Sequence, residues 1–244
     1  MIKKFYNKLK NRFSYITYKP LATRDEYLSL HEDCKLQEFS VIDKLEESSG
    51  FKIDTDYFEN LALHTQVCIK KSKLNYQHGR ILYTILSKYI QDNSCDSVNI
   101  IETGTARGFS SICMSKAIND IGKKGLIYTC DIIPHNKKIY WNCIDDADSK
   151  KTRNELLSHW KNEVKNINFY EGKSKKIFKK LGVERFHFAF LDAVHDYKEV
   201  ISEFKYVRNK QKKGDIIVFD DVTASLFPGV VKAIEEVRKN KEYS

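Results

Sequence analysis

The sequence predicts an α/β fold, in which a doubly wound, mostly parallel sheet follows a helical N-terminal extension. Two observations predict it. Up to about residue 92 the apolar residues recur at helical spacing, whereas after Cys95 short apolar runs alternate with helical segments. This alternation is typical of βαβ units, whose parallel sheets carry helices on both faces. With 244 residues, 41% of them hydrophobic, the chain is long enough to bury such a core.

The first 73 residues are expected to form the helical extension. Residues 1–20 contain six basic residues and no acid, so they supply +6 of the net charge of +9. Their apolar residues recur at helical spacing, which predicts a basic amphipathic helix. Such a helix could pack on its own domain or on a second copy in a homodimer, or it could lie on an anionic membrane surface. A capping box from Thr23 to Glu26 and apolar patterns over 40–47 and 56–67 predict further helices.

Residues 74–244 are expected to form the domain that contains the sheet. The predicted strands are short apolar runs over 98–102, 126–131, 167–170, 186–191 and 215–219. The predicted helices around them cover 76–90, 110–118, 151–164, 174–181, 197–210 and 230–239. Four of the five strands end in carboxylates, and ligands of such sheets bind at the carboxyl ends of the strands. We therefore expect the functional site at this edge.

The composition argues against several classes of protein. The six cysteines include no CxxC pair, which is typical of free thiols in a reducing cytoplasm rather than of a zinc site. No apolar run reaches the roughly 18–20 residues of a membrane-spanning helix, and the N-terminus lacks the apolar region of a signal peptide. Residues 21–244 carry only +3, so no nucleic-acid partner is expected. We expect a cytoplasmic protein, with peripheral contact to the inner face of the membrane only through residues 1–20.

The segment between the first strand and its helix reads Glu102-Thr-Gly-Thr-Ala-Arg-Gly108. Its glycines allow the backbone to approach a ligand, although the middle glycine of a GxGxxG fingerprint is missing. Asp131 ends the second strand, where a carboxylate can bind ribose hydroxyls or can instead cap a helix. Together these residues predict a nucleoside cofactor. The candidate contacts are Glu102, Gly104, Thr105, Ala106, Arg107, Gly108, Ser110 and Asp131.

Three carboxylates end the fourth and fifth strands: Asp192, Asp220 and Asp221. Like charges at one sheet edge repel each other unless a cation lies among them. Oxygen donors suit a hard divalent cation, so we expect Mg²⁺ or Mn²⁺. The alternative is that Asp221 caps a helix while the other two carboxylates face solvent.

These segments resemble class I S-adenosylmethionine-dependent methyltransferases, and the resemblance covers roughly residues 74–241. It is carried by ETGTARG, by the acid of YTCD131, by FAFLDAVHDY and by IVFDDVT followed by FPGVVKAI. More narrowly, they are similar to metal-dependent O-methyltransferases related to catechol O-methyltransferase and to bacterial sugar and macrolide O-methyltransferases. The cephalosporin-hydroxylase-like proteins of glycan gene clusters are also similar. The resemblance implies a Rossmann-like fold and S-adenosylmethionine as cofactor.

The resemblance also implies roles for single residues. Gly104 to Gly108 would wrap the methionine moiety, Asp131 would bind the ribose and Ser174 would approach the adenine. Asp192, Asp220 and Asp221 would bind the metal. His195 would act as general base, with Asp192 as the second candidate for that role. Tyr76 and His78 would belong to a loop that closes over cofactor and acceptor.

The sequence departs from the family at two places. Lys173 stands where relatives often carry an acid, which bears on the adenine contact of Ser174. The family also continues into a sixth strand and an antiparallel seventh, so we expect a domain that is short at its C-terminus.

The function that this resemblance implies is metal-assisted O-methylation of a sugar, glycan or related small molecule. A metal-dependent hydroxylase or a cofactor-binding protein on the same fold stays open as an alternative. A nucleic-acid methyltransferase is less favoured, because LDAV replaces the proline-rich tetrad of amino-directed enzymes. The segment around His135, Trp141 and Asp145 could line the acceptor pocket or form a solvated loop, and we favour the loop.

Overall fold

The computed structural model describes residues 18–70, 72–192, 195–239 and 243, so nearly all of the predicted amphipathic segment lies outside the described residues. Five parallel strands form one sheet in the order β3-β2-β1-β4-β5. The strands are β1 (Ser97–Thr103), β2 (Lys124–Asp131), β3 (Ile167–Glu171), β4 (Phe188–Leu191) and β5 (Ile216–Phe219). The predicted α/β fold with a doubly wound parallel sheet is confirmed.

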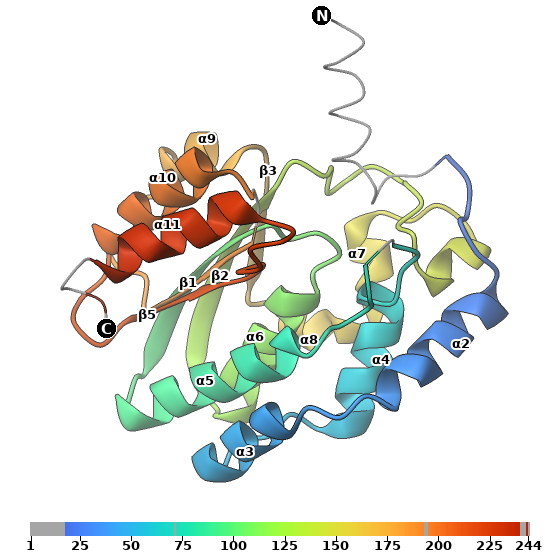
Figure 1. Ribbon diagram of the computed structural model, residues 1–244, viewed down its shortest axis with the longest axis horizontal. Coiled ribbons are helices and arrows are strands. Elements are labelled where there is room, and N and C mark those ends of the chain that lie inside the picture. The colour runs from blue at the N-terminus through green and yellow to red at the C-terminus, as the bar shows by residue number, and fades with distance from the viewer. Residues whose placement is uncertain (1–17, 71, 193–194, 240–242, 244) are drawn as a thin grey trace, which may run out of the picture.

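Helices cover both faces of this sheet (Figure 1). One face carries α9 (Ser174–Phe178), α10 (Tyr197–Arg208) and α11 (Pro228–Arg238), and the other carries α5 (His78–Asp92) and α6 (Phe109–Asp120). Along β4, Phe188 and Phe190 belong to the core on the α5–α6 side, whereas Ala189 and Leu191 belong to the core on the α9–α10 side. Both faces of the strand are buried, which explains its continuous apolar run.

The N-terminal helices α2 (Arg24–Lys35), α3 (Ser40–Ser49) and α4 (Thr55–Thr65) lie beyond α5 and α6 (Figure 1). The capping box predicted at Thr23 and Glu26 is present at the start of α2. Tyr27 and Leu61 of these helices belong to the same buried cluster as Phe109 and Phe190. The extension therefore shares a continuous core with the sheet.

The pairing register aligns the functional edge of the sheet. Thr103 pairs with Leu191, and Leu191 pairs with Phe219. The residues that follow these pairs, Asp192 and Asp220, therefore lie side by side at the ends of neighbouring strands. The chain crosses from one side of β1 to the other between β3 and β4, which makes the carboxyl ends of β1 and β4 the topological switch point where ligands of such sheets bind.

Two expectations about the segment between β2 and β3 are wrong. The single helix predicted over 151–164 is three short pieces: α7 (Arg153–Leu156), η2 (Ser158–Trp160) and α8 (Lys161–Val164). The segment before it, which includes η1 (Ile144–Ala147), is not a solvated loop. Trp141 is fully buried in a small cluster with Ile133, Ile139, Cys143 and Leu156. Burial of this large indole stabilises the fold more than solvation of the loop would, and the many polar residues of the segment gave no periodic apolar pattern that predicts the packing.

The outer edge of the sheet is formed by β5, which pairs only with β4 among the described residues. The Gln211 side chain donates a hydrogen bond to the Ile216 carbonyl at 3.0 Å, and the Tyr243 hydroxyl donates to Gln211 Oε1 at 2.8 Å. Within the described ranges, no helix combines the length and apolar character needed to cross a membrane.

Candidate active site

The loop between β1 and α6 has the backbone of a ligand-binding turn. Gly104 and Gly108 lie in the left-handed region, with φ of 92° and 96°, and Ala106 joins them with φ of 45°. A Cβ atom on Gly108 would lie 2.8 Å from Cδ1 of Leu157, the end of a side chain that can shift, so the position favours glycine chiefly because of its φ. The Asp131 carboxylate accepts hydrogen bonds from the Ala106 N–H at 2.7 Å and the Ile133 N–H at 2.9 Å. It thereby links the ends of β1 and β2.

Glu102, at the end of β1, is completely buried. Its carboxylate accepts short hydrogen bonds from the Ser110 and Ser111 hydroxyls in the first turn of α6. Burial raises the pKa of Glu102, although these hydroxyls oppose the shift. Glu102 and Ser110 were predicted as cofactor contacts, and the structure shows that their side chains bond to each other inside the fold.

The Arg107 side chain also points inward and is only 2% exposed. It donates to the carbonyl oxygens of Trp141 at 2.6 Å, Asn142 at 3.0 Å and Thr65 at 3.4 Å. The Thr105 hydroxyl bonds to that of Thr129 at 2.6 Å. The predicted contact residues Thr105 and Arg107 therefore use their side chains to hold the loop in place.

Arg153 is a residue of this region that the sequence did not single out. It is 2% exposed, and its guanidinium donates to the Ala106 carbonyl at 3.0 Å and the Ile133 carbonyl at 3.3 Å. It therefore braces the two strand ends that Asp131 also joins. The sequence offers no signal for it, because a lone arginine beside a helix start resembles any solvated charge.

Three side chains converge at the ends of β4 and β5. His195 Nε2 lies 2.6 Å from Asp221 Oδ2 and 3.9 Å from Asp192 Oδ1. Asp221 lies in the left-handed region with φ of 57°, a strained conformation for a non-glycine residue that turns its carboxylate towards His195. Asp220 Oδ1 accepts from the Asp221 N–H at 2.8 Å. The predicted residues Asp192, His195, Asp220 and Asp221 thus lie together.

The charges in this cluster shift one another. Burial of Asp192, reinforced by the charges of Asp220 and Asp221, raises its pKa to about 7, while the nearby imidazole of His195 opposes the shift. Burial would lower the pKa of His195, but the close contact with Asp221 and the charges of Asp192 and Asp221 outweigh it and raise the pKa to about 9. At neutral pH, His195 is therefore an imidazolium that partly neutralises the carboxylates.

A divalent cation fits this donor set. Among the described residues, the group whose ligand atoms lie within 4.8 Å of one another consists of Asp192, His195 and Asp221. Two carboxylate oxygens and one imidazole nitrogen suit Mn²⁺ well and Mg²⁺ through the carboxylates. Two of the three predicted ligands, Asp192 and Asp221, belong to this group, and Asp220 lies beside it, so the metal ligation stays a prediction. His195 is a potential ligand that the sequence suggested only as a base.

His78 and Tyr76, predicted in one closing loop, lie in different surroundings. The His78 ring stacks on Phe190, with ring centres 6.1 Å apart, and the charges of Asp220 and Asp221 act on it. Burial nevertheless lowers the pKa of His78. Tyr76 is fully buried, and its hydroxyl donates to Glu59 Oε2 at 2.7 Å. Of the two, His78 lies at the strand ends, and the Tyr76 side chain belongs to the core.

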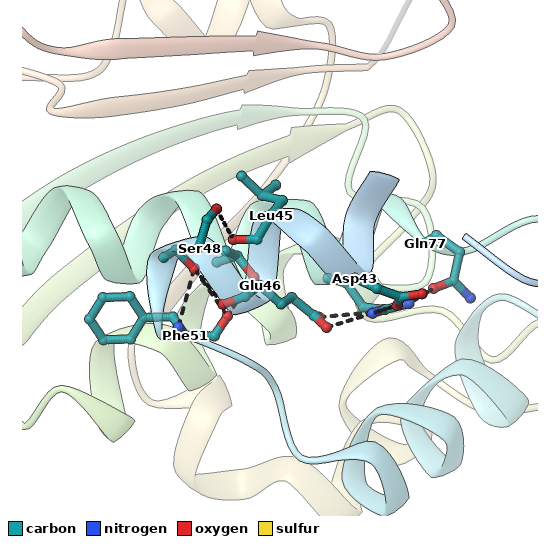
Figure 2. Close-up of polar contacts among 9 residues, drawn as sticks. Asp43, Leu45, Glu46, Ser48, Phe51 and Gln77 are labelled. Atoms are coloured by element: carbon teal, nitrogen blue, oxygen red, sulfur yellow. Dashed lines mark hydrogen bonds and ion pairs between the residues drawn. The ribbon is translucent and has the colours of Figure 1, made fainter. Parts of the chain in front are cut away.

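The position of His78 depends on an anchor between α3 and the start of α5. The Arg80 guanidinium donates to Glu46 Oε1 at 2.8 Å, Asp43 Oδ1 at 2.6 Å and Gln77 Oε1 at 3.1 Å. Figure 2 shows Asp43, Glu46 and Gln77 converging around these contacts. The anchor fixes the helix turn that carries His78.

Ser174, the predicted adenine contact, is the first residue of α9 and is 8% exposed. Its hydroxyl lies near the carboxylate of Glu203 in α10 and lowers the pKa of that group. Burial nonetheless dominates and raises the pKa of Glu203 to about 7. Sequence reasoning missed Glu203, because α10 reads as an ordinary amphipathic helix.

Comparisons with known proteins agree with this architecture. Residues 101–222, half of the chain, match the family model described as a methyltransferase domain. No curated protein matches the sequence.

Three solved structures share the fold. The O-methyltransferase NovP is 13% identical, with 91% of this chain and 93% of that chain covered and a TM-score of 0.53. Cofactor-bound Rv0187 from MTB is 14% identical, with 77% and 80% covered and a TM-score of 0.53. The SAH-bound methyltransferase PaMTH1 from Podospora anserina is 13% identical, with 84% and 90% covered and a TM-score of 0.52. The family match and the Rossmann-like sheet together identify the chain as a member of the methyltransferase-domain family.

Proposed function

We propose that this protein is an S-adenosylmethionine-dependent O-methyltransferase that uses a divalent cation and acts on a hydroxyl of a sugar, glycan or related small molecule. The observation that carries the proposal is the cluster of Asp192, His195 and Asp221 at the ends of β4 and β5. It lies at the same sheet edge as the glycine-containing loop after β1, so cofactor and acceptor could meet there.

In this reaction the acceptor oxygen attacks the methyl carbon of the sulfonium. The new C–O bond forms as the S–CH₃ bond breaks, the bonding electrons go to sulfur, and the hydroxyl proton is lost. Alignment of the reacting atoms contributes roughly 7–11 kcal/mol to such a transfer. The backbone of Gly104 to Gly108 and the Asp131 carboxylate would bind the cofactor. The SAH-bound structure of PaMTH1, which shares the fold, supports S-adenosylmethionine as that cofactor.

Asp192 and Asp221 would hold the cation, with Asp220 completing the set, which leaves Nε2 of His195 available to accept a proton. When bound, the cation would lower the pKa of a coordinated hydroxyl. His195 would accept the proton at Nε2, which requires that it first lose the proton it shares with Asp221. A cation bound to Asp192 and Asp221 would neutralise the two charges that raise the pKa of His195. The pKa of His195 would then return towards the range useful for a base.

Calorimetry with S-adenosylmethionine, with and without Mg²⁺, tests the cofactor first. Transfer of a labelled methyl group to a panel of sugar nucleotides and glycans, with and without EDTA, then tests the reaction. We expect Asp221→Asn to lower Mn²⁺ affinity and transfer together, whereas Asp96→Asn, at a fully exposed side chain, changes neither. Full transfer in excess EDTA would refute the role of the cation. Binding of both ligands without transfer to any hydroxyl would favour the cofactor-binding or hydroxylase-like alternative.

A further inference from the structure

Glu203 is a buried carboxylate that lies beneath the proposed cation site. It extends from α10 and is only 3% exposed. One of its oxygens, Oε2, accepts a hydrogen bond from the Thr103 hydroxyl at 3.0 Å. The other, Oε1, is completely buried and has no partner in hydrogen-bond geometry among the described residues. The Ser174 hydroxyl lies near the same carboxylate but does not form a hydrogen bond with Oε1. Because a buried carboxylate oxygen without a partner is costly, we expect a water molecule to satisfy it.

The space next to Glu203 can supply that partner. A small cavity between β4, β5, α10 and α11 is lined by Glu203 and by three residues of the strand-end cluster: Asp192, His195 and Asp220. Its volume of about 10 Å³ is at the lower limit of what one water molecule occupies. Its walls are otherwise apolar, and they include Val200 and Val230.

The chemistry of the lining favours water over a second cation. The ligand group that lies within 4.8 Å does not include Glu203, so the Glu203 carboxylate is not itself placed as a ligand of that group. Carboxylates are acceptors, and a water molecule offers two donors. One water can therefore satisfy Glu203 Oε1 and, with its second hydrogen, a carboxylate oxygen of Asp192 or Asp220.

We propose that Glu203 is a positioning residue that, through one buried water, orients one carboxylate of the strand-end cluster, that of Asp192 or Asp220, for a divalent cation. Its other oxygen bonds to Thr103, the residue before Gly104, so the same carboxylate also joins the cation site to the start of the proposed cofactor loop. This role rests on the proposed function, because it requires that the cluster binds a cation. Partners of this kind, one layer outside the ligands, typically change metal affinity by about 10–100-fold.

The test measures Mn²⁺ affinity of the full chain by calorimetry, without cofactor or acceptor. We expect Glu203→Leu, which cannot hold the water, to weaken Mn²⁺ binding by about 10–100-fold. Glu203→Gln keeps an oxygen and an N–H for the water and should restore affinity to within a few-fold of the wild type. Thr103→Val is the matched control, because it removes the other hydrogen bond of Glu203 with little change in shape.

Val200→Ile supplies an independent variant in case Glu203→Leu does not fold. The added methyl group would enter the cavity and displace the water while leaving Glu203 in place, so Mn²⁺ affinity should again fall. If the folded Glu203→Leu variant, or Val200→Ile in its place, binds Mn²⁺ like the wild type, the positioning role is refuted while the cation site stands. If the wild type itself binds no Mn²⁺, both this role and the cation part of the proposed function are refuted.

Discussion

Substitution of Gly229 tests whether the packing of α11 sets the geometry of the strand-end cluster. A Cβ atom at this position would lie 2.8 Å from the His195 carbonyl oxygen and 3.0 Å from the Tyr197 nitrogen. Ordinary contact begins at 3.4 Å, and both atoms belong to the backbone, so the segment that carries His195 must move by about 0.6 Å. His195 Nε2 lies only 2.6 Å from Asp221 Oδ2, and functional geometry tolerates displacements of about 0.5 Å.

We therefore expect Gly229→Ala to lower Mn²⁺ affinity by at least about tenfold. Overpacking of this kind also costs about 1–3 kcal/mol, and each kcal/mol lowers Tm by about 2–4 °C in a chain of this size. Calorimetry and thermal unfolding measure the two effects.

Gly182→Ala is the matched control, because a Cβ atom there meets nothing within 4 Å and φ is not positive. Wild-type Mn²⁺ affinity in a folded Gly229→Ala variant would show that the close approach of α11 does not set the cluster.

Three further predictions concern the cofactor loop and the buried charges. Asp131→Ala removes the acceptor of the Ala106 and Ile133 N–H groups. The affinity for S-adenosylmethionine, measured by calorimetry, should therefore fall at least about tenfold. An unchanged affinity would contradict the proposed cofactor site. Without metal, the imidazole of His195 should titrate by NMR near its raised pKa of about 9. Its contribution to the free energy of unfolding is therefore complete below the unfolded pKa of 6.5 and disappears as pH rises through 9. Asp221→Asn should lower the pKa of His195, and a titration that this substitution leaves unchanged would contradict the pairing. Glu203 has a folded pKa of about 7 against an unfolded value of 4.5, so the folded protein binds the proton more tightly and loses roughly 3 kcal/mol of stability as pH rises from below 4.5 to above 7. The decrease in the free energy of unfolding from pH 4 to pH 8, measured by urea unfolding, should be smaller for Glu203→Gln than for the wild type. Equal decreases would mean that Glu203 titrates normally.

The strand-end carboxylates could be predicted from the sequence because the signal is local. Each apolar run of a parallel sheet ends where its chain emerges, and the parallel arrangement brings these ends to one edge. The convergence of Asp192, Asp220 and Asp221 follows from this alone. Their relation to His195 was only partly predictable, because the Asp221 carboxylate meets the imidazole from a left-handed backbone conformation that the sequence does not reveal.

The inward-facing arginines could not be predicted in the same way. The three carbonyl oxygens that bind Arg107 come from Thr65, Trp141 and Asn142, which are more than 30 residues away along the chain. No local pattern distinguishes such an arginine from a solvated one. Tyr76 and His78 show the same limit at short range, because α5 begins at His78, and a shift of two residues at a helix start changes which side chain faces the core.

The Arg107 contacts have a consequence for how this chain could have evolved. Its guanidinium joins the loop after β1 to the end of α4 and to the segment around Trp141. A chain that started at residue 74 would lose the Thr65 carbonyl and would uncover Phe109, which packs against Phe58 with ring centres 5.6 Å apart. The N-terminal helices therefore cannot be exchanged between relatives as an independent module. Deletion or replacement of α2 to α4 is therefore expected to destabilise the sheet and to displace the loop after β1 at the same time.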